Sequence, residues 1–282
     1  MQESNSLFSV ILICYNNQEY LPVSIGSVLE QNYKNIELII ADDFSTNFNV
    51  NEWDDYVRKH NNGNIKNIII YQNEKNIGTV KNINNALKKV TGNYVKILAA
   101  DDALYNNMTL ENAKIALDKS KFGIIAGNVY KYDSNSFVEI GKYSNDFIEN
   151  YNKYNSIKCF KNECIRNKVI AGSVFFNNYF FSKYGLFDED CLLIEDWSKW
   201  LQVYLEGGII EYYNFDALKY RFDAGVGRSI NKIYINDKKI IFRKYVKNNK
   251  RKIGVLNYLK ALFTFKIRTS VFLRKIYNFI FR

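Results

Sequence analysis

The stretch YVKILAADD, residues 94–102, decides the fold of this 282-residue chain. Its apolar run predicts a buried strand, and the run ends in two adjacent carboxylates, Asp101 and Asp102. Two negative charges at the mouth of a core repel each other and lose hydration, so both raise the free energy of the folded state. The stretch therefore predicts a strand end that needs a compensating partner.

Three other runs of apolar or β-branched residues also end in polar side chains: FSVILICYNN (8–17), NIELIIADDFS (35–45) and NIIIYQNE (67–74). With residues 94–102 they predict four parallel strands. Helical spacing is found in YLPVSIGSVLEQN (20–32), in GTVKNINNALKKVTG (78–92), where Gly92 is the expected stop, and in TLENAKIALDKS (109–120). This alternation predicts an α/β fold with a Rossmann-like, doubly wound, mostly parallel sheet, and ligands bind such sheets beyond the carboxyl ends of the strands.

The second section, about residues 121–230, is more mixed. It predicts a hairpin (122–132 with 137–143), a long irregular connection (145–168), a strand (171–181) and a helix in IEDWSKWLQVYLEGG (194–208). Since no linker rich in Pro, Gly or Ser separates the sections, residues 1–230 are expected to form one domain with halves 1–120 and 121–230. Residues 231–282 form a separate basic tail.

The amino-acid composition argues against several catalytic mechanisms. The single histidine, His60, lies in KHNNGN, which is typical of a solvated turn, so neither a Ser-His-Asp triad nor an H-E-x-x-H zinc site is expected. The four cysteines show no C-x-x-C spacing and are expected to be reduced and structural. An enzyme with this composition would have to use carboxylates for proton transfer.

The sequence does not indicate either of two other classes of enzyme with a doubly wound sheet. No G-x-G-x-x-G follows the first strand, which argues against a nicotinamide oxidoreductase, and no P-loop motif is present. Neither a signal peptide nor a membrane-spanning apolar stretch is apparent, so we expect a cytoplasmic protein.

Each of three acidic pairs has a structural and a functional interpretation. Asp101 and Asp102 could cap a helix, or hold Mn²⁺ or Mg²⁺ for a diphosphate. The pair Asp42 and Asp43 in ADDFST could form a turn, or accept hydrogen bonds from a base or ribose. The third pair, in IEDW, could merely benefit from the helix dipole, or act as a general base whose pKa the adjacent tryptophans raise.

In order and spacing, motifs across residues 7–230 resemble those of the inverting, family-two glycosyltransferases with the GT-A fold. The motifs are the opening stretch VILICYNNQEYLPVSIGSVLEQNYKNIELIIADDFST, then NEKNIG with VKNINNAL, GNYVKILAADD, FDED, IEDWSKWLQV and YRFDAGVGRS. The resemblance implies transfer of a sugar from a nucleotide-sugar donor, with uridine as the nucleotide, to a hydroxyl group of a glycan or lipid-linked acceptor. It also implies a place in the synthesis of a cell-surface polysaccharide, such as capsule or lipopolysaccharide.

The resemblance also assigns roles to residues. The nucleotide contacts would be Tyr15 and Asp43, with Cys14, Glu19 and Asp42 close by, and Lys81 or Asn82 would reach the ribose or diphosphate. The metal site would be Asp102 and Asp101, with Asp101 also near the ribose. The general base would be Asp196, with Glu195 adjacent, and the sugar or acceptor pocket would include Gly172, Ser173 and Trp197.

Three features depart from the family pattern. ICYN stands where many relatives have P-T-Y-N, AADDAL lacks the commoner third acid, and Asp223 replaces a frequent histidine, so its role at the metal is an open question. The alternative function is a non-catalytic protein that binds a nucleotide sugar or assembles a polysaccharide complex.

The tail carries all of the excess positive charge. From Lys238 to Arg282 there are 14 Lys or Arg residues and no acid, whereas the other 237 residues hold 25 basic and 29 acidic ones. Large apolar residues between the cations favour an amphipathic helix on an anionic membrane, at its inner face, over a nucleic-acid arm. A charged face packed on the domain is the alternative for the tail, and a homodimer is left open.

Overall fold

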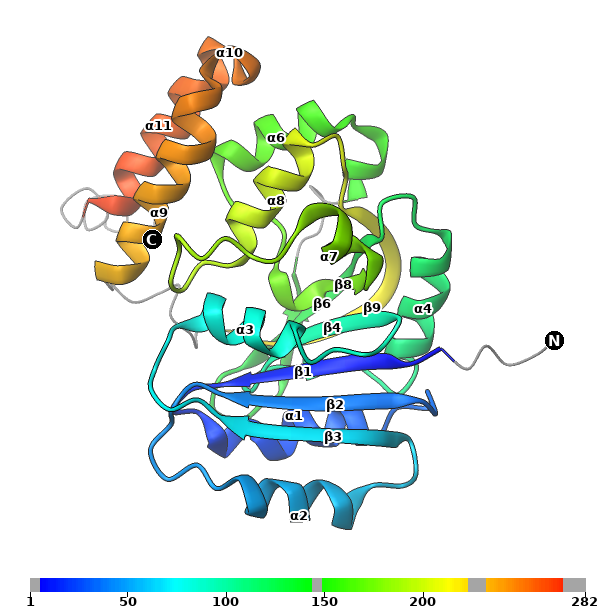
Figure 1. The fold of residues 1–282 in the computed structure, drawn as a ribbon. Helices are drawn as coiled ribbons and strands as arrows, with labels where there is room; N and C mark the ends of the chain where they lie inside the picture. Colours follow the sequence, from blue (N-terminus) through cyan, green and yellow to red (C-terminus); the bar gives the residue numbers. More distant parts are fainter. Residues whose placement is uncertain (1–5, 144–148, 223–231, 271–282) are drawn as a thin grey trace.

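The computed structural model describes residues 6–143, 149–222 and 232–270 (Figure 1). Four parallel strands build the first half of one sheet, in the spatial order β3 (Ile65–Gln72), β2 (Ile36–Asp42), β1 (Phe8–Cys14) and β4 (Tyr94–Ala99). β1 pairs in parallel with both β2 and β4. All four strands were predicted: β1, β2 and β4 are nearly continuous, largely buried apolar runs, and the edge strand β3 contains the half-buried run Ile68–Tyr71.

The second half extends the same sheet. β8 (Val174–Asn177) lies antiparallel between β4 and β6 (Ile124–Asp133), and β9 (Glu211–Phe222) runs parallel to β6. Two short strands, β7 (Glu139–Lys142) and β5 (Ala103–Leu104), pair antiparallel with β6 and β9 respectively. The predicted 122–143 hairpin is confirmed, and the continuous, mostly parallel sheet joins both halves.

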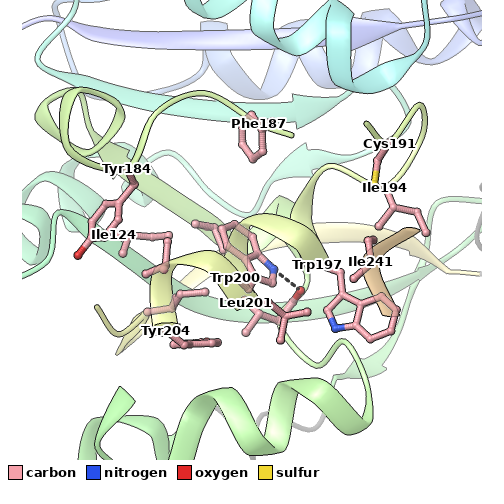
Figure 2. Close-up of a cluster of buried hydrophobic side chains, with 14 of the residues drawn as sticks. Ile124, Tyr184, Phe187, Cys191, Ile194, Trp197, Trp200, Leu201, Tyr204 and Ile241 are labelled. Carbon is pink, nitrogen blue, oxygen red and sulfur yellow. Dashed lines mark hydrogen bonds between the residues drawn. The ribbon is translucent and has the colours of Figure 1, made fainter. Parts of the chain in front are cut away.

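Helices cover both faces of the sheet. α1 (Leu21–Leu29), α2 (Val50–His60) and α4 (Thr109–Lys119) share one apolar core with β1 and β2. On the other face, α3 (Thr79–Leu87), α6 (Ser156–Ile165), α7 (Tyr179–Tyr184) and α8 (Asp196–Leu205) share a second core. Figure 2 shows this second core around α8, where Trp197, Trp200, Leu201 and Tyr204 lie among Ile124, Phe187 and Ile241.

Several local predictions were wrong or incomplete. The predicted turn around His60 is the end of α2, where the exposed ring lies 2.7 Å from the Tyr56 carbonyl oxygen. The connection expected to be irregular contains α6, and the expected strand 171–181 divides into β8 and α7. Gly92 does not stop α3, which ends at Leu87; a Cβ at Gly92 would lie 2.5 Å from the Ser9 hydroxyl oxygen, so a close approach of two chain segments requires the glycine.

The described part of the tail is helical, as predicted. It comprises α9 (Lys232–Ile241), a π-helical turn (Phe242–Val246), a 3-10 turn (Lys247–Asn249), α10 (Lys250–Ile253) and α11 (Val255–Thr269). Its side chains Ile241, Val246, Ile253 and Ala261 are buried in the core that contains α6 and α8. One face of the tail therefore packs on the domain. Among the described residues, we find no helix that combines the length and the apolar character needed to cross a bilayer.

Candidate functional site

A cleft of about 650 Å³ opens where the carboxyl ends of β1, β2 and β4 face the start of α8 and one side of α9. The converging strand ends predicted this location. The predicted residues that line the cleft are Cys14, Tyr15, Asp43, Asn82, Asp101, Asp102, Gly172, Glu195 and Asp196. The cleft thus brings together, from both halves of the chain, most of the residues that the sequence singled out.

Its first wall follows β1 and β2. Tyr15 is 51% exposed, so its ring is free to stack on a flat ligand, whereas Cys14 is buried and its thiol donates to Asn17. Burial and the nearby Asp42 charge raise the pKa of Cys14 to about 12, so the thiol stays neutral. Asp43 accepts hydrogen bonds from the backbone N–H groups of Ile77 (3.0 Å) and Gly78 (2.8 Å). These bonds fix one carboxylate on the wall.

Of the two residues proposed to reach the ribose or diphosphate, only Asn82 lines the cleft. Its amide donates to the Ala41 carbonyl at 2.9 Å and its oxygen accepts from Asn73 at 3.0 Å. Lys81 is exposed on the outer side of α3, because neighbouring helical positions point in different directions.

Four other predicted residues lie outside the cleft wall. Asp42 is fully buried and accepts from Ser45 and Gln72, so it holds the turn after β2. The exposed Glu19 lies in the 3-10 turn Gln18–Tyr20, close enough for its charge to raise the pKa of Asp101. Ser173 is buried and donates to the Ile170 carbonyl, and the Trp197 indole donates to the Glu163 carbonyl at 2.9 Å.

The acidic pair after β4 forms the floor of the cleft. Asp102 is 6% exposed and its Oδ1 accepts the Arg221 backbone N–H at 2.9 Å. Burial, and then the Asp101 charge, raise the pKa of Asp102 well above its ordinary value. Burial also raises the pKa of Asp101, while the Arg221 charge opposes that rise. Ionising both carboxylates together is therefore unfavourable without further positive charge.

Arg221 supplies part of that charge, and the sequence analysis did not identify it. Its Nε donates to the Asp101 carbonyl at 3.0 Å, and its guanidinium lies between the rings of Tyr20 (4.2 Å) and Phe137 (4.4 Å). The only signal was its place in the quoted motif YRFD. The buried Lys96 of β4 also favours the ionised form of Asp102 when it is protonated, but burial lowers the pKa of Lys96 to about 7.

The acidic pair is chemically suited to a divalent cation. Its donors are hard carboxylate oxygens, and Asp102 is a buried acid that one more positive charge would favour in the ionised form. Within the described ranges, no cluster of three His, Cys, Asp or Glu side chains is present, so water and phosphate oxygens would complete the coordination. The third predicted ligand, Asp223, lies outside the described residues.

The second acidic pair lies across the cleft at the start of α8. Glu195 is the N-cap residue and Asp196 the first helical residue, where the helix dipole favours negative charge. Burial nevertheless raises the pKa of both acids, and with the Asp196 charge it brings the pKa of Glu195 to about 8. The Asn167 amide donates to Asp196 at 2.7 Å. Asn167 was missed, because nothing in IRNK indicates which amide will meet an acid 29 residues away.

Comparisons with known proteins identify the family of the chain. The profile of Glycosyl transferase family 2 matches residues 9–182. Glycosyltransferase GlyG of Streptococcus pneumoniae serotype 4 is 28% identical over 129 residues, which are 46% of this chain and 41% of GlyG. The Escherichia coli protein WfgD, a UDP-Glc:alpha-D-GlcNAc-diphosphoundecaprenol beta-1,3-glucosyltransferase, is 33% identical over 52% of this chain and 54% of its own length. The chain thus spans about half the length of these curated relatives.

Among solved structures, S. aureus TarS 1-349 in complex with UDP-GlcNAc is similar, with a TM-score of 0.61 and 17% identity over 95% of this chain and 83% of TarS 1-349. That likeness concerns the fold and confirms the predicted GT-A architecture. Since the family profile covers more than half of the sequence, the chain belongs to glycosyl transferase family 2.

Proposed function

We propose that this chain is an inverting glycosyltransferase that moves a sugar from a uridine-diphosphate sugar to a hydroxyl group of a lipid-linked glycan. The observation that carries the proposal is the placement of two acidic pairs, one after β4 and one at the start of α8, in the lining of one cleft. One pair suits a cation and diphosphate, and the other suits an acceptor hydroxyl. Because the chain belongs to a glycosyltransferase family, we favour this function over that of a non-catalytic protein that binds a nucleotide sugar.

The donor and acceptor classes are supported by the relatives. WfgD is named for UDP-glucose and for an acceptor on diphosphoundecaprenol, and TarS was solved with UDP-GlcNAc. In this chain, Tyr15 and Asp43 would contact the nucleotide. Asn82 lies on the same wall and would face the ribose or diphosphate. We place the reaction in the synthesis of a cell-surface polysaccharide.

In the proposed reaction, the bond from the anomeric carbon to the diphosphate breaks as a bond to the acceptor oxygen forms on the opposite face. Asp196 accepts the hydroxyl proton, and the Asn167 hydrogen bond fixes the direction of its carboxylate. A raised pKa makes Asp196 a stronger base than an ordinary aspartate. Asp101 and Asp102 would hold Mn²⁺ or Mg²⁺, which when bound neutralises charge on the diphosphate.

We further propose that α11 rests on the inner face of the cell membrane. Val255, Leu256, Leu259 and Phe263 are between 55% and 79% exposed, and they share one side of the helix. The exposed Lys252, Lys260 and Lys266 flank this apolar stripe. An apolar stripe with flanking cations suits an anionic bilayer surface.

A vesicle flotation assay tests the membrane proposal. The double variant Leu256→Glu, Phe263→Glu should lose binding to anionic vesicles, whereas Ile115→Glu should not, because Ile115 is an equally apolar exposed residue on α4. Equal binding by both variants would contradict the proposal.

A thermal-shift panel of nucleotide sugars, with and without Mn²⁺, tests the proposed donor. Uridine donors should raise the melting temperature more with Mn²⁺ than without it, since a ligand stabilises the state that binds it. The Asp102→Asn variant should lose the metal-dependent part of the shift. A shift with a nicotinamide cofactor and none with uridine donors would refute the proposed function.

A further inference from the structure

The segment that leads into the second acidic pair is held by one carboxylate of the tail. Asp237, on α9, is 1% exposed, and its Oδ2 accepts from three successive backbone N–H groups. The donors are Leu192 (3.0 Å), Leu193 (2.6 Å) and Ile194 (3.1 Å). Successive N–H groups that converge in this way form an anion nest, here filled by a side chain of the protein itself.

The same segment also contacts the first wall of the cleft. The Leu192 carbonyl accepts the Val80 N–H at 3.2 Å. Gly78 lies so close to Leu192 that a Cβ at this position would be 2.6 Å from the leucine side chain, and its φ of +88° also favours glycine. Since Gly78 donates to Asp43, a continuous path of contacts runs from Asp43 through Leu192 to Asp237.

From this arrangement we infer that Asp237 is a positioning residue for the proposed reaction. Glu195 and Asp196 follow the anchored residues directly, so Asp237 sets where α8 begins and how far Asp196 lies from the nucleotide wall. α9 thereby belongs to the active site, and Ile233 and Tyr234 of the same helix line the cleft. The expected effect on kcat rests on the proposed function, whereas the anchoring of residues 192–194 by Asp237 does not.

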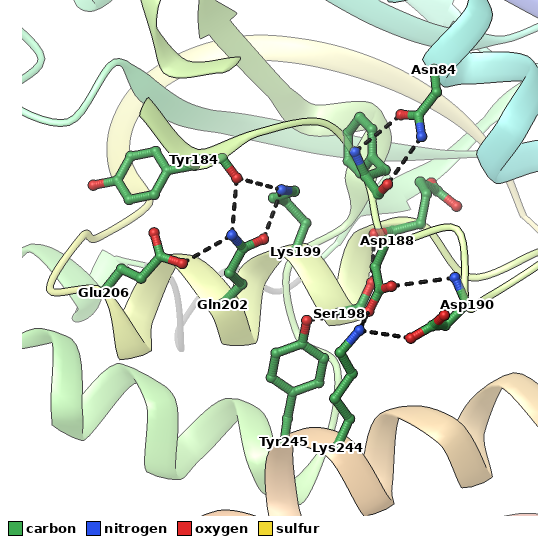
Figure 3. A network of polar contacts seen from close by, with 12 residues as sticks. Asn84, Tyr184, Asp188, Asp190, Ser198, Lys199, Gln202, Glu206, Lys244 and Tyr245 are labelled. Carbon is green, nitrogen blue, oxygen red and sulfur yellow. Dashed lines mark hydrogen bonds and ion pairs between the residues drawn. The ribbon is translucent and has the colours of Figure 1, made fainter. Parts of the chain in front are cut away.

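A second contact between the same two segments provides a matched control. Lys244 forms ion pairs with Asp188 (2.7 Å) and Asp190 (2.8 Å), and the Tyr245 hydroxyl lies 3.3 Å from Asp188, as Figure 3 shows. This contact also joins the tail to the loop before α8, but it is partly exposed and lies farther from Glu195. If Asp237 only fastened the tail, loss of either contact would have similar consequences.

The experiment compares Asp237→Ala and Asp237→Asn with Lys244→Met in the full chain. We expect Asp237→Ala to lower kcat about 10²-fold, since a displacement of about 1 Å at a reacting group has that effect. UDP affinity, measured by calorimetry, should stay within about threefold, because Asp43 and Tyr15 do not touch Asp237. Asp237→Asn keeps an acceptor oxygen and should recover most of the lost kcat, and Lys244→Met should change it little.

Hydrogen exchange provides a readout that does not depend on the reaction. The amides of residues 192–194 should lose protection in Asp237→Ala and keep it in Lys244→Met. Failure of the wild-type chain to turn over any donor would count against the proposed function, while the exchange result would still test the anchoring. The inference is overturned if these amides exchange alike in both variants, or if kcat falls no further in Asp237→Ala than in Lys244→Met. Should the alanine variant not fold, Asp237→Leu decides, because leucine keeps the side-chain volume but has no acceptor oxygen: unchanged kcat and unchanged exchange in that variant overturn the inference.

Discussion

The pair Asp101–Asp102 and the pair Glu195–Asp196 are alike in sequence and different in surroundings. All four carboxylates line one cleft, and burial raises the pKa of each. The first pair lies near Arg221 and near the buried Lys96, whose pKa burial lowers to about 7. In the second pair, Asp196 accepts hydrogen bonds from a neutral amide, that of Asn167, and from the Trp197 backbone N–H. Two adjacent acids therefore do not define a role until their partners are known.

The difference in partners separates the two roles proposed for the pairs. Positive charge favours the ionised form, so the first pair is suited to become fully ionised when it binds a further cation. A neutral donor orients a carboxylate without holding it ionised as strongly, so the second pair is better suited to accept a proton.

The largest effect is expected from Asp196→Asn. Removal of the proton acceptor should lower kcat by about 10²- to 10⁴-fold, the usual contribution of a general base. The thermal shift with a uridine donor and Mn²⁺ should remain, because the first pair is intact. Steady-state kinetics of the variant are compared with those of Asp54→Asn, which alters a half-buried acid on α2 that pairs with Arg58. Full activity of Asp196→Asn would show that another group accepts the proton, whereas a wild type that binds a uridine donor but turns none over would favour the non-catalytic alternative.

A smaller effect is expected for Asp102→Asn without metal. This substitution should raise the free energy of unfolding, whereas Asp196→Asn should lower kcat. Because the pKa of Asp102 is higher in the folded state than in the unfolded state, protonated Asp102 stabilises the fold. This stabilisation is complete below the pKa of an unfolded aspartate and is lost as pH rises through the pKa of Asp102 in the folded state. The asparagine variant lacks that loss and keeps the oxygen that accepts from Arg221. At neutral pH it should be more stable than the wild type by about 1 kcal/mol, the scale of a favourable single substitution.

Urea denaturation at several pH values, without metal, measures this effect. The difference between Asp102→Asn and the wild type should grow from acid to neutral pH. A variant less stable than the wild type at neutral pH would show that the existing partners already compensate the buried charge. The comparison between the two pairs would then lose its electrostatic basis.

The sequence predicted the first half of the fold and the location of the cleft, because uninterrupted apolar runs define strands and their polar ends define the sheet edge. It did not predict α2, although Val50, Trp53 and Val57 follow the i, i+3, i+7 spacing of a helix; Val57 is the only buried residue of α2, and the run of Asn and Asp around it is also typical of a turn. Nor did it identify the partners of the acids. The hydrogen bond from Arg221 to Asp102 joins residues 119 positions apart, and only the folded topology brings them together.

The smallest effect is expected within the second pair. At pH 7, a carboxyl with a pKa of about 8 is mostly protonated, so Glu195→Gln replaces one neutral group with another of similar shape. Its kcat at pH 7 should fall by less than about threefold, in contrast to that of Asp196→Asn. The difference should appear at higher pH, where ionised Glu195 raises the free energy of the wild type through repulsion of Asp196.

The free energy of unfolding should also depend on the protonation of Glu195, because the pKa of Glu195 in the folded state lies above its ordinary value of 4.5. The wild type gains full stability from protonated Glu195 below about pH 4.5 and loses it progressively as pH rises through about 8. Glu195→Gln has no such loss, so urea denaturation should find it more stable than the wild type at pH 9 and closer to it at pH 6. If Glu195→Gln instead lowers kcat at pH 7 as strongly as Asp196→Asn does, the proton acceptor is the pair acting together, and the distinction between its two members fails.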